Sequence, residues 1–472
     1  MSGRDVGGDR LREMQRGLRM SHPPDPGALA AEKRDLTELE KASPLRRTRA
    51  YLKLSGPGYM QSAMTLGGGT AIASLGAGAA FGYKLLWVAP TAMLLGIVML
   101  TAVSHQTLST GMRPFDAMAR FAGKPLAWAW AIGALLSSII WHFPQYSLAS
   151  AGLVDIGAAF GLTWQPQYMS FVILAWAIGL STLYGKSPTW VRLYERLLKY
   201  MVWGIVLCFG YVVFKTGVDW SRVAEGLTFQ LPDSREGVAA VTLILSGLSA
   251  AVGVNMLFLY PYSLLARGWG REHRRLARFD LYVGMLIPYV LATGLILIAS
   301  ANTLYDDFAG DSIAAVDAAQ SLATVIGPRL GRSIFDLGLI GMALSSISLQ
   351  MLTCGFVATE LFGWEVGSRK HQLAMLIPTP GVLGPVLWTK LVWLAVPTNI
   401  VCGLFLPAAY LGFTLLQRNE QYMGSDLVRG PRGRIWFLAM LGITVFMVVF
   451  LGWYMMQYGP GYFDTYLTST DG

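Results

Sequence analysis

The chain has few charged residues for its length. Only 14% of its 472 residues are Asp, Glu, Lys or Arg, whereas a soluble domain carries about 25%. Apolar runs near twenty residues recur along the chain, and this is the length that crosses a bilayer as an α-helix. The alternation of a membrane β-barrel is absent from these runs. The composition therefore excludes an ordinary soluble domain and predicts an all-α membrane protein.

Cysteines and enzyme motifs are also scarce. Cys208, Cys354 and Cys402 lie within apolar runs, so we expect small buried hydrophobes rather than disulfides or metal ligands. No His-Glu-x-x-His, Gly-x-Ser-x-Gly or P-loop pattern occurs, so we expect neither an enzyme nor a cofactor. The net charge of +9 comes from Lys and Arg in loops between apolar runs, where they set membrane orientation rather than bind nucleic acid.

The apolar runs predict eleven membrane spans. Their approximate bounds are 56–83, 85–109, 125–154, 167–184, 197–216, 237–266, 279–301, 334–362, 371–394, 397–417 and 433–457. We expect residues 1–50 to form a disordered basic tail in the cytoplasm, 51–460 a transmembrane transporter domain, and 461–472 a short tail outside. The basic loops follow the even-numbered spans, on the side of the basic N-terminus, which places the N-terminus inside and the C-terminus outside an inner cell membrane.

Two of these spans contain a polar break. The first is interrupted by Gly67, Gly68 and Gly69, and three glycines each cost roughly 1 kcal/mol in a helix. The sixth is interrupted over 246–256, and Pro261 follows. Because the two broken spans are five apart, an odd number, the second set of five spans runs in the opposite direction, as in inverted-repeat transporters. The alternative is that these glycines only allow close helix packing.

Several motifs resemble the natural resistance-associated macrophage protein (NRAMP) family of metal-ion transporters. They are Gly56-Pro57-Gly58-Tyr59, Ala77–Trp87, Ser109-Thr110-Gly111 with Asp116-Ala117, Phe356-Val357 with Glu360, and Thr398–Val401 with Leu406-Pro407. The resemblance covers about residues 50–457. It implies a LeuT-type fold of two inverted repeats of five helices, with discontinuous first and sixth helices.

The chain departs from the family at the metal-binding motifs. Where the family has Asp-Pro-Gly-Asn in the first span, this chain has Leu66–Thr70, without a carboxylate. Where the family has Met-Pro-His in the sixth span, this chain has Val254-Asn255-Met256. Asn399 replaces the glutamine of the tenth span. The resemblance therefore implies the fold, with the metal motif lost and a bicarbonate-transporting branch as the related group.

These replacements predict a site for a small monovalent oxyanion, with bicarbonate as the first choice. Backbone N–H groups of consecutive glycines form anion-binding concavities, and helix starts at Thr70 and Asn255 would add positive dipole ends. The predicted substrate-binding residues are Leu66, Gly67, Gly68, Gly69, Thr70, Val254, Asn255, Met256 and Asn399.

An anion entering a negative cytoplasm needs a driving ion, so we expect coupling to Na⁺ or H⁺. Thr65 and the eighth-span residues Ser345, Ser346 and Ser348 offer oxygens for Na⁺, and His142, with Gln145 on the same helix face, is a candidate proton relay. Two alternatives stay open. The chain could carry a divalent metal such as Mg²⁺, kept largely hydrated, or Mn²⁺, or it could be a membrane scaffold or sensor that transports nothing.

Overall fold

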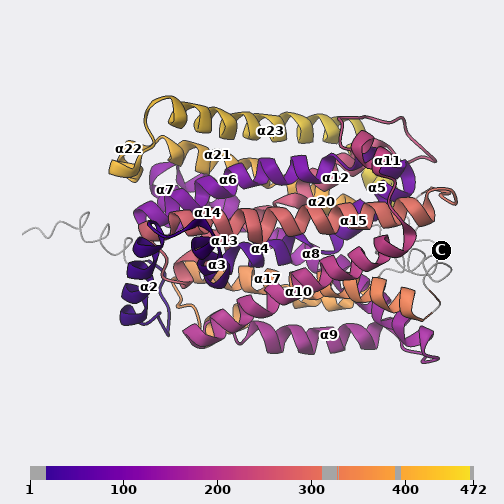
Figure 1. Cartoon of the computed structure of the whole chain (residues 1–472), viewed down its shortest axis with the longest axis horizontal. Helices are drawn as coiled ribbons and strands as arrows, with labels where there is room; N and C mark the ends of the chain where they lie inside the picture. The colour runs from indigo at the N-terminus through magenta and orange to yellow at the C-terminus, as the bar shows by residue number, and fades with distance from the viewer. Residues whose placement is uncertain (1–16, 311–326, 328, 388–394, 468–472) are drawn as a thin grey trace, which may run out of the picture.

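Long helices running side by side make up the computed structural model, which describes residues 17–310, 327, 329–387 and 395–467 (Figure 1). Eight helical segments are long and apolar enough to cross a membrane, and a bent pair adds a ninth in the part of the chain described. The straight spans include α6 (Val88–Thr110), α8 (Lys124–Ala159), α10 (Pro188–Thr216), α17 (Leu330–Phe362) and α23 (Gly430–Leu467). The all-α membrane fold is therefore confirmed.

The first predicted span is broken, as its glycines indicated. Helix α4 (Pro57–Thr65) ends before Leu66, and α5 (Gly68–Phe81) starts after Gly67, with a bend of 53° between them. The sixth span divides in the same way into α12 (Ala240–Ala251) and α13 (Val254–Ala266), separated by Val252 and Gly253. Glycine at each break costs little in packing because no Cβ occupies the crowded interior.

The remaining helices overlap the residue ranges predicted as spans, but they do not establish the predicted number of spans. They comprise α9 (Pro166–Ser181), α14 (Arg274–Leu281) with α15 (Ile287–Leu304), and α20 (Ala395–Gly403) with α21 (Leu406–Gln417). The predicted ninth span holds only the short α18 (Arg369–Ala374), η4 (Thr379–Leu383) and α19 (Gly384–Leu387), and 388–394 lie outside the described residues. The count of eleven spans stays a prediction.

The segment expected to be a disordered tail contains two helices. Helix α2 (Pro26–Leu39) starts at Asp25, whose carboxylate accepts from the N–H groups of Gly27 and Ala28, and α3 (Pro44–Leu54) follows. Leu36 and Leu39 are buried, so this segment has an apolar face that its charged composition concealed. Residues 1–16 lie outside the described part. At the other terminus α23 extends to Leu467, into the stretch expected as a tail.

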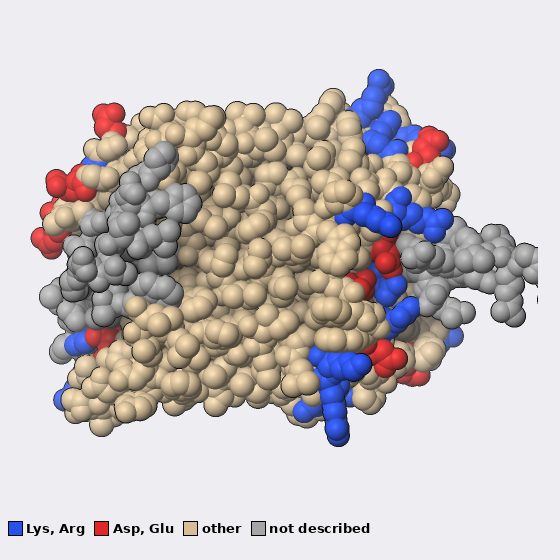
Figure 2. Space-filling view, turned by 180° about the vertical axis from the view of Figure 1, so that it is seen from behind, with Lys and Arg blue, Asp and Glu red and all other residues tan. Residues whose placement is uncertain are grey.

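On the face that Figure 2 shows, charged side chains gather at the two ends of the molecule and leave a wide uncharged middle. The Lys and Arg residues concentrate at the end where α2, α7 (Pro114–Phe121) and α22 (Glu420–Met423) lie (Figure 1). This uncharged belt is the surface that a lipid bilayer covers. Asp311 and Asp317, which the sequence places between the predicted seventh and eighth spans and so opposite the basic loops, lie outside the described residues.

A buried carboxylate anchors the start of the broken span. Asp280, on α14, is fully buried, and its Oδ2 accepts from the N–H of Gly58 at 2.7 Å and of Gly56 at 3.3 Å. These N–H groups belong to the first turn of α4 or precede it and have no partner within the helix. A Cβ on Gly58 would overlap Asp280, so glycine is required for this contact.

Replacing Asp280 with Ala should therefore destabilise the protein. The change leaves two backbone N–H groups buried without an acceptor, which costs about 1–3 kcal/mol, and the melting temperature in detergent should fall. The exposed Asp35 of α2 provides the control, since Asp35→Ala removes one carboxylate without a buried partner. Equal melting temperatures for the two variants would contradict this role of Asp280.

Candidate functional site

A cavity lies where the two broken spans meet. Its empty volume is about 330 Å³, which includes the solvent space at its opening. Helices α4, α5, α8, α12, α13, α17 and α20 contribute its walls. The lining residues are Met64, Thr65, Gly67, Gly69, Thr70, Trp141, Gln145, Ser249, Ala250, Gly253, Asn255, Met256, Ser346, Gln350 and Asn399.

Hydrogen bonds within the protein use several donors at the glycine break. The N–H of Gly68 donates to Oε1 of Gln145 at 2.7 Å. The Thr70 hydroxyl donates to the carbonyl of Thr65, and the Thr65 hydroxyl donates to the carbonyls of Ala250 and Ala251 at the end of α12. These contacts tie the two breaks together and leave fewer donors for an anion.

The half-helices also start earlier than predicted. Gly67 and Gly253 precede the first turns of α5 and α13, so neither Thr70 nor Asn255 takes the capping position. Asn255 instead accepts through its Oδ1 from the N–H of Met256 at 3.0 Å. A hydroxyl or amide one or two residues into a helix is free to bond elsewhere, and here both side chains bond within their own break.

Oxygen acceptors dominate the polar groups left over in the cavity. Asn399 donates through Nδ2 to the Ser246 hydroxyl at 2.7 Å and to the Gly69 carbonyl at 3.3 Å. Its Oδ1, like Oε1 of Gln350 and Oγ of Ser249, is buried without a hydrogen-bond partner in the described chain. Buried polar atoms are rarely left in this state, and two of these three atoms are amide oxygens that only accept.

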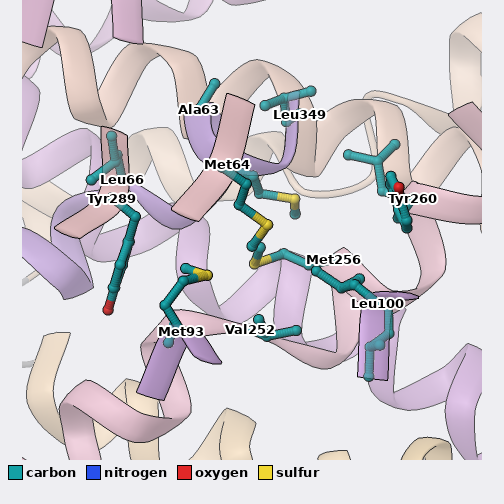
Figure 3. Close-up of a cluster of buried hydrophobic side chains, with 14 of the residues drawn as sticks. Ala63, Met64, Leu66, Met93, Leu100, Val252, Met256, Tyr260, Tyr289 and Leu349 are labelled. Carbon is teal, nitrogen blue, oxygen red and sulfur yellow. The ribbon is translucent and has the colours of Figure 1, made fainter. Parts of the chain in front are cut away.

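Thioethers lie beside these oxygens. The side chains of Met64, next to the first break, and Met256, in the first turn of α13, extend toward one another, with Met93 of α6 nearby (Figure 3). Met256 Sδ also accepts from the N–H of Gly253 at 3.3 Å. Thioether sulfur is a soft metal ligand, although methionine also serves simply to fill irregular space.

Among the described residues, none that lines the cavity carries a carboxylate. Over the described ranges, no three His, Cys, Asp or Glu side chains gather in a way that could hold a metal ion. The free cysteines lie apart, with Cys354 and Cys402 buried and Cys208 half-buried. A cation here would meet the neutral ligand groups that the described lining residues offer.

The predicted coupling-ion residues reach the end of α4. The hydroxyls of Ser345 and Ser346 donate to the carbonyls of Ala63 and Met64 at 2.9 and 3.2 Å, while Ser348 bonds to the Tyr194 hydroxyl and the Ser345 carbonyl. Only Thr65 and Ser346 of this group line the cavity. Their role in ion coupling stays a prediction.

His142 lies behind the cavity wall. It is fully buried, and its Nδ1 bonds to the Ser138 carbonyl at 2.8 Å, while the Gln350 side chain lies within reach of its ring. Gln350 lines the cavity and His142 does not. A relay role for His142 therefore stays a prediction that would operate through Gln350.

The cavity unites most of the predicted site residues. Gly67, Gly69, Thr70, Asn255, Met256 and Asn399 line it, whereas Leu66, Gly68 and Val254 do not. Sequence reasoning missed Met64, Trp141, Ser249, Ala250, Gly253 and Gln350 as lining residues. Spacing gives a signal for Gln350, which stands four residues after Ser346 on one helix face. No such signal exists for Trp141, which resembles any aromatic residue of a membrane helix.

Comparison with known proteins decides the family. A model of natural resistance-associated macrophage protein-like proteins matches residues 58–456. The chain belongs to this family. The divalent metal cation transporter MntH 1 of Pseudomonas aeruginosa is 26% identical over 400 residues, which are 81% of this chain and 87% of that protein. MntH of Brucella suis is 22% identical over 85% of this chain and 87% of its own length.

Solved structures agree on the fold. A mutant manganese transporter from Eremococcus coleocola superposes with a TM-score of 0.72 at 16% identity, covering 92% of this chain and 89% of that one. The nucleobase-cation-symport-1 family transporter Mhp1 gives a TM-score of 0.56 at 13% identity, covering 85% and 92%. These likenesses confirm the NRAMP resemblance and the LeuT-type fold.

The predicted substrate was wrong. The relatives of this chain are named divalent metal cation transporters, which contradicts a small anion, bicarbonate included, as the transported partner. The physical reason lies in the break itself: Gln145 already accepts the Gly68 N–H, and the leftover oxygens of Asn399 and Gln350 would repel an anion.

Close packing at Gly69 offers a test of the cavity wall. A Cβ there would overlap the Trp141 ring and lie 2.6 Å from Oδ1 of Asn399. Gly69→Ala should therefore displace Trp141, lower stability by about 1–3 kcal/mol and reduce transport. Gly204→Ala on α10, where a Cβ meets nothing within 4 Å, is the matched control. The measurements are the initial uptake rate and the melting temperature. Wild-type values of both for Gly69→Ala would contradict the close packing of Gly69 against Trp141.

Proposed function

We propose that this chain is a multi-pass transporter of a divalent metal cation, Mg²⁺ or Mn²⁺, which it binds partly hydrated between the broken helices. The observation that carries this proposal is the set of unpartnered buried oxygens of Ser249, Gln350 and Asn399 around the cavity. Membership of a family with divalent metal cation transporters supports the same cargo.

The missing carboxylate defines how the metal is held. A bare divalent ion at the membrane midplane without a negative partner is expensive. Mg²⁺ gives up its waters reluctantly and usually keeps several of them, so its shell spreads the charge over neutral groups that accept hydrogen bonds from those waters. Helices α4 and α12 end at the breaks with the negative ends of their dipoles, and α5 and α13 start there with positive ends, so a bound cation is favoured on the side of α4 and α12.

Metal choice follows from the donor set. Amide, hydroxyl and carbonyl oxygens suit Mg²⁺ and Mn²⁺, whereas the thioethers of Met64 and Met256 favour softer ions. We assign the oxygens to the ion and its water shell, and the thioethers to filling the irregular space around it. A site of this kind binds weakly, which suits release on the far side of the membrane.

The charge distribution indicates how the chain is oriented in the membrane. The end that carries α2 and α7 is the more basic one (Figure 2), and positive residues favour the cytoplasmic side. We infer that the N-terminus lies in the cytoplasm of an inner cell membrane and that Asp219, Asp233, Asp306 and Asp307 face outward.

Uptake in proteoliposomes tests the proposal. Mg²⁺ or Mn²⁺ uptake should saturate, and its rate should not depend on bicarbonate. Ser249→Ala removes one cavity oxygen, so the half-saturating metal concentration should rise roughly two- to tenfold, as expected for one lost hydrogen bond.

Ser263→Ala serves as the control. The Ser263 hydroxyl is buried and donates to the Tyr260 carbonyl of its own helix at 2.6 Å, away from the cavity, so metal uptake should stay at the wild-type level. Flux of neither metal above protein-free vesicles would overturn the proposal and favour a scaffold or sensor.

A further inference from the structure

Two buried carboxyl groups meet near the ends of α8 and α17 that lie away from the basic face. Asp155 lies four residues before the end of α8, and Asp336 lies six residues after the start of α17. Their exposed fractions are 4% and 1%. Each stands ten residues from a cavity residue of its own helix, Gln145 and Ser346, or about 15 Å along the axis. The pair is therefore separate from the cavity.

Arg332 balances only one of the two carboxylates. Its Nε donates to Oδ2 of Asp155 at 3.0 Å, and its Nη2 pairs with Oδ1 of the same group. The carboxyl of Asp336 lies within hydrogen-bonding reach of Asp155, and neither of its oxygens receives a hydrogen bond from a donor that the described chain provides. With both acids ionised, the cluster would hold one uncompensated negative charge.

The helix packing keeps the carboxyls together. A Cβ on Gly152 would lie 3.0 Å from Cγ1 of Ile340 and 3.6 Å from the carbonyl of Asp336. Gly152 thus allows α17 to approach α8 within one turn of Asp155. The contact between the acids follows from this close approach and is not a chance meeting of mobile surface side chains.

We propose that Asp155 and Asp336 share one proton and form a proton-binding site at the outer end of α8 and α17. Two buried carboxyls in contact do not both ionise readily, and one proton turns their repulsion into an O–H···O hydrogen bond. A divalent ion fits less well, because Arg332 already uses two lone pairs of Asp155 and the cluster would become positive. Arg332 is 20% exposed along its side chain, so water reaches the site.

Other titratable groups near the pair are few. Helix α9, which packs on both α8 and α17, carries no charged residue. From α10, Cys208 faces Gly338, two residues beyond Asp336, and its thiol is neutral at physiological pH. Within the residues described here, Asp155, Asp336 and Arg332 are the groups that set the charge of the site.

The proton has a predictable effect on the protein. In the folded state the two carboxyls share a proton, whereas in the unfolded chain the two separated carboxylates release it. The proton therefore contributes to stability at low pH, and this contribution is lost as pH rises. Loss of the proton leaves two carboxylates facing across α8 and α17 and loosens the outer end of this helix pair.

Infrared difference spectroscopy between acidic and alkaline buffer tests the site without relying on transport. Wild-type protein in vesicles should show the C=O band of a buried protonated carboxyl that disappears at alkaline pH. Asp336→Asn should remove this band and flatten the fall of melting temperature with pH, because the amide donates to Asp155 permanently. Asp233→Asn, at an exposed carboxylate, should leave both readouts unchanged.

An unaltered band in Asp336→Asn would overturn the proposal, as would wild-type protein that shows no band at any pH. If Asp336→Asn does not fold, Asp336→Glu replaces it, and its band should move while persisting; an unmoved band would assign the proton elsewhere. Because neither readout involves metal, the proton site and the proposed metal transport fail or stand separately.

Discussion

Every backbone group freed by a helix break inside a membrane must find a partner, and the fold is arranged to provide those partners. In hydrocarbon an unpaired N–H or C=O costs several kcal/mol. Gln145 receives the N–H of Gly68, and Thr65 reaches the carbonyls at the end of α12. Each of these groups is therefore completed by a residue of another span, which ties α5 to α8 and α4 to α12.

This constraint explains why much of the fold can be predicted from sequence. Long apolar runs and a run of three glycines are local signals, so the spans and the break at Gly67 follow directly from them. The helices α2 and α3 were missed because their charged surface hides a narrow apolar face that includes Leu36 and Leu39. The predicted ninth span, 371–394, stays a prediction: prolines interrupt helices without changing overall hydropathy, and its described part contains only the short elements over 369–387.

The site was harder to predict because its chemistry depends on contacts between distant residues. Glycine N–H groups look like an anion nest when considered alone, yet Gln145 stands 77 positions away and accepts the first of them. Likewise, the Asn399 side chain carries both a donor and an acceptor, and sequence alone does not say which of them faces the cavity. In the structure its Nδ2 donates to Ser246 and Gly69. The remaining Oδ1 then offers an acceptor to the cavity. Sequence alone does not tell which end of an amide faces a ligand.

The charges of the molecule are separated from its cavity, and this separation shapes how transport can be driven. Neutral groups line the cavity, while the buried carboxylates of Asp155, Asp280 and Asp336 lie outside its lining. A cation bound among neutral groups adds its whole charge to the site, because no negatively charged residue in the described lining offsets that charge. Its entry and exit then respond strongly to membrane potential. For the proposed divalent cargo, a negative cytoplasm contributes about 4.6 kcal/mol per 100 mV to inward movement, so a neutral site would suffice for uptake, whereas a carboxylate would hold the ion more tightly and slow its release.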